Sequence, residues 1–395
     1  LPMYYRRGLT SIYTYLSQRF GFASHKSGTV LFLLSKMTGA CARFFLVCLI
    51  LQQFVFDRFE IPFVVTVLVL LLLVWVYTRR AGVRTLVYTD SLQTLCMLTA
   101  LVAVIVLIAK QMNLDFGGLL QTVSHSEYGR IFVFDDWMSR QAFWKQFLSG
   151  VFVAIVMTGL DQDMMQKNLT CKNLREAQKD MCTYGVCFIP VNFLFLVLGV
   201  LLYTFAISQG IALPEKTDTL FPTLVHDGCF GYAVTILFVL GIAAAAFSSV
   251  DSALTALTTS FCIDILDIER KGMDVVKATR IRHLVHLAVV IVFVIFTLVF
   301  KALNSTSVID AIYIMASYTY GPLLGLFAFG LFTRRMPRDR YIPFVCVLSP
   351  VICYVLSVTV PKATGYQFGY ELLMLNGLLT FAGLWLLSAG RKAVG

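Results

Sequence analysis

The chain has 395 residues and a net charge of +10; 58% of its residues are hydrophobic, only 14% are charged, and the mean hydropathy is +0.79. A soluble domain carries about 25% charged residues, so the composition excludes an ordinary soluble globular protein. The ten cysteines include no CxxC pair and lie mostly in apolar runs, which argues against a disulfide framework.

Ten apolar segments are long enough to cross a membrane, because the hydrocarbon core of a bilayer is about 30 Å thick and needs about 20 residues per helix. Backbone groups in lipid must pair within their own segment, which makes helices the default. The sequence therefore predicts an all-α polytopic membrane protein, with residues 1–395 forming a single transmembrane domain. The predicted spans are 28–54, 60–78, 85–109, 147–165, 181–208, 230–263, 284–303, 307–332, 342–360 and 370–389.

The basic residues alternate between the two sides of this topology. Of the 32 lysines and arginines, 22 fall in loops on one side, eight in loops on the other, and two inside the first span. Because basic loops are retained in the cytoplasm, we expect both ends of the chain to be cytoplasmic and the protein to lie in the cell inner (plasma) membrane. This topology accounts for the net charge, and no nucleic-acid partner is predicted.

The first span contains two basic residues, Lys36 and Arg43, which lie seven positions apart on one helix face. A charge inside a membrane must face a cavity or a partner. The two side chains could attract an anionic substrate, or they could pair with a buried aspartate. The residues of this span leave both interpretations open.

Asp90 opens the third span, at a depth of about 9 Å from the inner face, given a helical rise of 1.5 Å per residue. One interpretation is a carboxylate at a helix N-terminus, where the macrodipole favours a negative charge. The other is a functional ligand inside the membrane. The loop 110–146 that follows this span is predicted to be extracytoplasmic, and its aromatic residues indicate an interfacial helix. The loop could act as a substrate lid or as a structural connection.

The fourth span ends in a polar cluster near the inner face, formed by Thr158, Asp161, Gln162 and Gln166, with Gly159 among them. The cluster could be a helix end that meets water. It could also interrupt the helix, and broken helices are where many transporters build their binding sites.

The sixth span carries a polar stripe, because Ser248, Asp251, Ser252, Thr255 and Thr259 recur at helical spacing on one face. Hydroxyl and carboxylate oxygens suit a small hard cation such as sodium, by the logic that governs calcium sites. The hydroxyls alone could instead bond back to carbonyl groups and join helices. The carboxylate of Asp251 in the same stripe favours the cation site, at a depth comparable to that of Asp90.

Motifs of enzymes and ATP-driven pumps are missing from the sequence: there is no GxxxxGK[ST], HExxH or GxSxG. His283 and His286 lie three positions apart at a helix start, but a metal pair needs further ligands and none is evident. No enzymatic activity and no metal other than sodium are therefore predicted.

Five segments carry a resemblance to one family of membrane proteins. They are YYRRGLTSIYTYLSQRFG before the first span, VYTDSLQT in the third, LDQDMMQKN in the fourth, AAAAFSSVDSALTALTTSFCIDIL in the sixth and YGPLLGLFAFGLFTRR in the eighth. On these motifs the chain resembles the sodium:solute symporter family, which includes sodium–glucose, proline and sialic-acid symporters. The resemblance implies a leucine-transporter-like inverted-repeat helix bundle that works by alternating access.

The resemblance also implies two cation sites and a transported sodium ion. The matching positions are Ala245, Ser248 and Ser249 for the main sodium site, and Asp90, Asp251 and Ser252 for the second cation site. Asp251 stands where the family has a hydroxyl, so a proton could replace or accompany sodium at that site.

Substrate contacts are implied at Asp161 and Gln162, and Lys36 and Tyr313 are further candidates. Ile314 stands at the position where sugar cotransporters have a glutamine, which argues against a hexose. Family members carry two or three helices before the loop at which this chain begins. We therefore expect the chain to be N-terminally truncated, and we do not expect the fragment to transport alone.

These observations predict a sodium-coupled secondary active symporter that imports a small polar solute, which could be a sugar, a sialic acid, an amino acid or an organic acid. Its partners would be the solute, sodium and the lipid bilayer. The alternative is a membrane solute sensor with a symporter-like body. A membrane enzyme would need a catalytic constellation, and the two histidines do not provide one.

Overall fold

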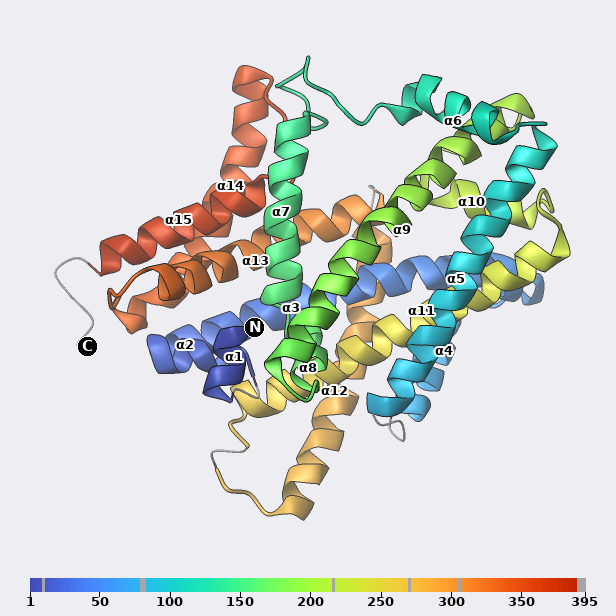
Figure 1. Ribbon diagram of the computed structural model, residues 1–395. Coiled ribbons are helices and arrows are strands. Elements are labelled where there is room, and N and C mark those ends of the chain that lie inside the picture. The colour runs from blue at the N-terminus through green and yellow to red at the C-terminus, as the bar shows by residue number, and fades with distance from the viewer. Residues whose placement is uncertain (9–10, 79–82, 215–216, 269–270, 304–306, 389–395) are drawn as a thin grey trace.

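A computed structural model of the chain describes residues 1–395 except 9–10, 79–82, 215–216, 269–270, 304–306 and 389–395. The described residues form helices and their connections, with no β-strand (Figure 1). This architecture confirms the predicted all-α class.

Each of the ten predicted spans overlaps a helix, and the fourth extends across a break into a second one. These helices are α3 (Phe22–Leu51), α4 (Phe63–Thr78), α5 (Val83–Gln111), α7 (Phe143–Gly159), α9 (Leu174–Ser208), α11 (Gly231–Ser260), α12 (Val275–Leu303), α13 (Val308–Phe332), α14 (Ile342–Thr364) and α15 (Leu372–Leu387). The shorter helices are α1 (Pro2–Arg7), α2 (Thr14–Arg19), α6 (Phe116–His125), α8 (Gln162–Leu169) and α10 (Leu220–His226). One turn of π-helix extends α3 over Gln52–Phe56, and another extends α11 over Phe261–Ile265.

Six of the described helices are long and apolar enough to cross a membrane by themselves, and the bent pair α7 and α8 makes a seventh candidate. Three shorter apolar helices, over Phe63–Val76, Gly231–Ile242 and Leu372–Leu387, account for the other predicted spans. The outer faces of the helices are apolar: on α14, for example, Phe344, Val347 and Val351 are exposed at helical spacing. Such faces are those of helices surrounded by lipid.

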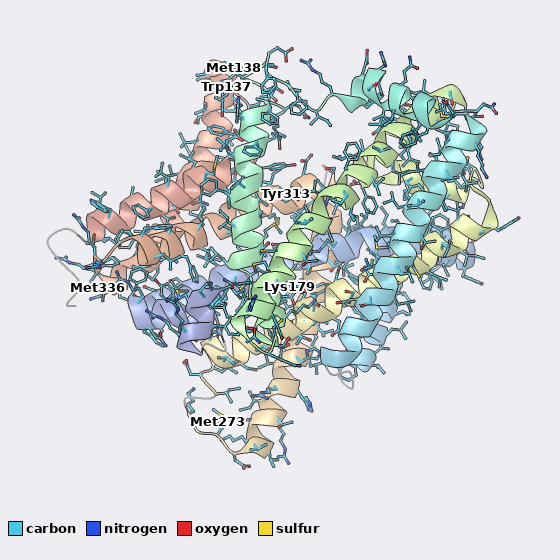
Figure 2. The ribbon with its side chains drawn as sticks, viewed as in Figure 1. Trp137, Met138, Lys179, Met273, Tyr313 and Met336 are labelled. Atoms are coloured by element: carbon cyan, nitrogen blue, oxygen red, sulfur yellow. The ribbon has the colours of Figure 1, made fainter. Side chains whose placement is uncertain are left out.

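Two connections predicted on opposite sides of the membrane lie at opposite ends of the molecule. Figure 2 shows Trp137, in the loop 110–146, at the top and Met273, in the connection between α11 and α12, at the bottom. The side of the membrane on which each loop lies stays a prediction. Arg79, Arg80, Arg270, Arg391 and Lys392, which contribute to the alternation of the basic residues, lie outside the described residues.

The centre of the bundle is built from α3, α11 and α13. Helix α3 packs against both α11 and α13, while α11 also packs against α5, and α13 packs against α15. Small residues bring α13 and α15 together: a Cβ atom on Gly325 would lie 2.6 Å from the carbonyl oxygen of Gly377. Glycine at such crossings lets helix backbones approach closely.

The N-terminal segment, of which residues 1–8 and 11–21 are described, is hydrogen-bonded to the central helices. His25 at the start of α3 lies 2.9 Å from the carboxylate of Asp264, through Nε2 and Oδ1, and Ser11 donates a 2.8 Å hydrogen bond to the same carboxylate. All three side chains are buried. The segment, α3 and the end of α11 are therefore held in one place relative to each other.

Candidate cation and substrate site

The fourth predicted span is broken where the polar cluster lies. Helix α7 ends at Gly159, α8 begins at Gln162, and the two helices are bent by 58°. Asp161 stands at the break with extended backbone, and its carboxylate accepts hydrogen bonds from the backbone N–H of Asp163 at 2.9 Å and of Met164 at 3.3 Å. A carboxylate at this position accepts hydrogen bonds from free N–H groups and is attracted by the positive end of the helix dipole. Asp161 therefore fixes the residue at which α8 begins.

The carbonyl groups freed at the break are bonded by the N-terminal segment. Tyr13 donates to the carbonyl oxygen of Leu160 at 2.7 Å, and Tyr4 donates to that of Gly159 at 3.1 Å. The fully buried side chain of Gln162 accepts a 2.9 Å hydrogen bond from the backbone N–H of Ile12. Unpaired backbone groups are costly inside a membrane, so these bonds are what make the break stable.

A buried ion-pair network joins the break to α3. The ammonium of Lys36 lies 3.2 Å from both carboxylate oxygens of Asp161 and 2.8 Å from Oδ2 of Asp163. Tyr320 of α13 donates a 2.7 Å hydrogen bond to Asp161. Of the two interpretations of Lys36, the structure therefore shows the pairing with a buried aspartate.

A cavity of about 1210 Å³ opens beside this network. It is lined by residues from α3, α7, α8, α9, α11 and α13. Lys36, Asp161 and Tyr313 face it, and Figure 2 shows Tyr313 near the middle of the molecule, between α7 and α9. The cavity is large enough for a small organic solute.

The polar stripe of α11 divides between this cavity and the protein interior. Ser248, Ser249 and Ser252 line the cavity, whereas Asp251 is fully buried and is not among the lining residues. The hydroxyl of Ser248 donates a short hydrogen bond to Oδ1 of Asp90 on α5. The expectation that Asp90 lies at the depth of the stripe is therefore confirmed.

Comparison with known proteins decides what kind of molecule this is. A model of the sodium:solute symporter family matches residues 1–339. The chain belongs to the sodium:solute symporter family. Members of this family are transporters and not enzymes, so the chain is a sodium-coupled solute symporter. Its partners are the solute, the sodium ion and the lipid bilayer.

Individual members of the family are similar along most of the chain. The sodium/sialic acid symporter NanT of Aliivibrio fischeri is 24% identical over 371 residues, which are 91% of this chain and 71% of that protein. The sodium/sialic acid symporter SiaT of Proteus mirabilis is 22% identical over 343 residues, which are 85% of this chain and 67% of that protein. The mouse sodium-coupled monocarboxylate transporter 1 is 24% identical over 342 residues, 84% of this chain and 54% of that protein.

A solved structure shares the fold of this symporter. It is the substrate-bound, outward-open state of a Na⁺-coupled sialic acid symporter, which covers 98% of this chain with a TM-score of 0.78 at 18% sequence identity. The chain covers 78% of that protein. The predicted transporter fold is therefore confirmed.

The positions that the resemblance assigned to ligands lie in different surroundings in this symporter. Ser248 and Ser249, assigned to the main sodium site, and Ser252, assigned to the second, share the cavity wall, while Ala245 is half-buried one turn earlier on α11 and does not line it. Gln162 is turned away from the cavity toward the N-terminal segment. The assignments themselves remain predictions.

The cavity residues that the sequence did not reveal include Asp163, Lys167 and Tyr370. Asp163 and Lys167 lie on α8, and only the direction of α8 after the bend turns them toward α3 and α5. Tyr370 packs its ring 4.9 Å from that of Tyr313, centroid to centroid. The signal available for Asp163 was a second carboxylate inside the fourth predicted span, because a charge within the membrane needs a partner or a cavity.

Proposed function

We propose that this symporter imports a small carboxylate-bearing solute into the cell, driven by sodium. The observation that carries the proposal is one cavity in which hydroxyl oxygens of α11 face basic side chains of α3. The named relatives transport sialic acid and monocarboxylates, which are both carboxylates. The protein would act as one transmembrane domain in the cell inner (plasma) membrane, with its loop 110–146 outside and α6 at the outer interface.

Arg43 is the candidate in the cavity wall for binding an anionic solute, because Lys36 and Lys167 each pair with an aspartate of the described chain. The lining residues of the described chain include three basic ones, Lys36, Arg43 and Lys167, and two acidic ones, Asp161 and Asp163. Lys36 is already neutralised by both aspartates. Arg43 lies two turns further along α3, and its buried Nε makes no hydrogen bond to the described residues. A guanidinium suits a carboxylate, which it can bind with two parallel hydrogen bonds.

Sodium would bind beside the cavity, at oxygens of α11 and α5. We propose Ala245, Ser248 and Ser249 as ligands of the main site, and Asp90, Asp251 and Ser252 as ligands of a second cation site. Hydroxyl and carboxylate oxygens are the donors that small hard cations take. Each inward sodium gains about 2.3 kcal/mol per 100 mV of membrane potential, which is available to concentrate the solute.

The test is uptake into proteoliposomes that contain the full-length gene product. Sialic acids, monocarboxylates, amino acids and neutral sugars are offered in sodium chloride and in choline chloride of equal concentration. We expect uptake of a carboxylate that requires sodium. Equal uptake in choline would reject sodium coupling, and sodium-driven uptake of neutral sugars alone would reject the substrate class.

The variant Arg43→Gln tests, in the same uptake assay, whether Arg43 binds the carboxylate of the solute. A charge-assisted hydrogen bond contributes about 1.5–3 kcal/mol, so the KM for the carboxylate should rise by about tenfold or more. An unchanged KM would remove Arg43 from the substrate site and leave sodium coupling untouched.

A further inference from the structure

Asp90 of α5 has two oxygens that meet different partners. Oδ1 accepts the hydroxyl of Ser248, one of the proposed cation ligands, while Oδ2 lies 3.6 Å from the ammonium of Lys167 on α8. This places a lysine charge on the carboxylate that would serve the second cation site.

Lys167 is free to move away from this carboxylate. Its side chain is 45% exposed, and that of Asp90 is 32% exposed. Asp163 lies one turn earlier on α8, and its carboxylate is already bound to Lys36 at 2.8 Å. Asp90 is thus the acidic group that Lys167 reaches among the described residues, through a loose and solvent-accessible contact.

A sodium ion and an ammonium carry the same charge, and two cations beside one carboxylate repel each other. A sodium ion that binds between Asp90 and the α11 hydroxyls must therefore displace the ammonium of Lys167. The displaced lysine belongs to α8, which follows the break and packs against α11 and α9. Sodium binding would thereby act on the half-helix that forms one wall of the cavity.

We propose that Lys167 is a tethered competitor of sodium: its ammonium neutralises Asp90 when sodium is absent and leaves when sodium binds. The inference rests on the proposed second cation site. It makes Lys167 a residue that sets the sodium affinity of the symporter by competition, without itself being a ligand.

The first readout is the sodium concentration that gives half-maximal uptake by the full-length gene product. Lys167→Gln removes the competing charge and should lower this concentration about five- to tenfold. Lys167→Arg restores a cation of similar reach and should return the value toward that of the wild type. Lys179→Gln, which alters an exposed lysine near the start of α9, is the matched control. On an Asp90→Asn background the effect of Lys167→Gln should vanish.

The second readout does not depend on transport. Purified wild-type protein is treated with an amine-acetylating reagent in sodium chloride or choline chloride, and modification of Lys167 is quantified by mass spectrometry. Sodium should increase acetylation of Lys167 several-fold and leave Lys179 unchanged. In Asp90→Asn, Lys167 should react quickly under both conditions.

The outcomes separate this inference from the proposed function. Sodium-independent acetylation of Lys167, or a Lys167→Gln sodium response equal to that of the wild type, overturns the competitor role while sodium-dependent uptake stands. If the wild type takes up solute equally in sodium chloride and in choline chloride, the proposed function is rejected instead.

Discussion

The carboxylate of Asp161 contacts three elements at once. It caps the first turn of α8, accepts the hydroxyl of Tyr320 on α13, and forms an ion pair with Lys36 on α3. A buried ion pair contributes little to stability by itself, but removing one partner leaves an uncompensated charge. The network therefore joins the half-helix after the break to the centre of the bundle.

The loss of stability on substitution of Asp161 should depend on how many of its contacts the new side chain removes. Asp161→Ala loses the cap of α8, the acceptor of the Tyr320 hydroxyl and one of the two carboxylates on Lys36, and should cost about 2–5 kcal/mol of stability. Asp161→Asn keeps one oxygen, which can still accept the hydrogen bonds from the first N–H groups of α8, and should cost less. The measurement is denaturation of purified protein in detergent, with the midpoint falling from wild type to Asn to Ala. A midpoint of Asp161→Ala equal to that of the wild type would mean that the network does not hold the break.

Ser249 offers a residue-level test of the main sodium site, because its hydroxyl is proposed as a ligand and lines the cavity. A lost ligand hydroxyl is worth about 0.5–1.5 kcal/mol, so Ser249→Ala should raise the sodium concentration for half-maximal uptake by roughly three- to tenfold. Thr99→Ala is the control, since Thr99 is exposed on α5 and bonds only within its own helix. An unchanged sodium response would remove Ser249 from the site.

At the scale of the elements, α13 and α15 depend on glycine where they cross. A Cβ on Gly325 would meet a backbone oxygen of α15, which cannot rotate away as a side chain could. Gly321 makes a similar approach to Asn376, whose amide bonds the carbonyl groups of Ser317 and Tyr318. The crossing therefore combines close backbone contact with a buried polar bond.

Gly325→Ala should force the two helices apart and cost about 1–3 kcal/mol, the range for overpacking a tight interior. The comparison is Gly199→Ala on α9, where an added Cβ has no atom within 4 Å and where alanine favours the helix by about 1 kcal/mol. The unfolding midpoint should fall for the first variant and stay level or rise for the second. The reverse order would contradict the packing described for α13 and α15.

At the scale of the whole molecule, the alternation of the basic residues along the sequence predicts which loops lie on each side of the membrane. Intact cells that express the full-length protein in a cysteine-free form can report which loops are outside. A membrane-impermeant thiol reagent should label Ser139→Cys in the loop 110–146 and should spare Met273→Cys until the cells are opened, because basic loops stay inside. Labelling of Met273→Cys in intact cells would invert the proposed topology.

Both the fold class and the outline of the site were predictable from the sequence. The apolar runs identified ten helices, since a chain in lipid must pair its backbone groups locally. The polar cluster at the end of the fourth span allowed two interpretations, a helix end that meets water or an interrupted helix. The structure shows the interrupted helix, with its break between Gly159 and Gln162. The inward row of hydroxyls on α11 followed from helical spacing alone.

The partners of the charged and polar side chains inside the bundle could not be predicted in the same way. Lys36 had to find a partner or a cavity, but nothing in the first span indicates that its partners lie on α8, 125 and 127 positions away. The direction of α8 after a 58° bend decided that Lys167 reaches Asp90, and that Gln162 meets the N-terminal segment instead of the cavity.

The sequence by itself thus determined the helices, their number and the polar faces, because hydrogen bonding in lipid and helical periodicity act over a few residues at a time. Only the tertiary structure decided which buried charges neutralise one another and which oxygens face the cavity. Those contacts join segments far apart in the sequence, such as Lys36 and Asp161 at a separation of 125 positions, and a buried charge requires a partner without specifying which one.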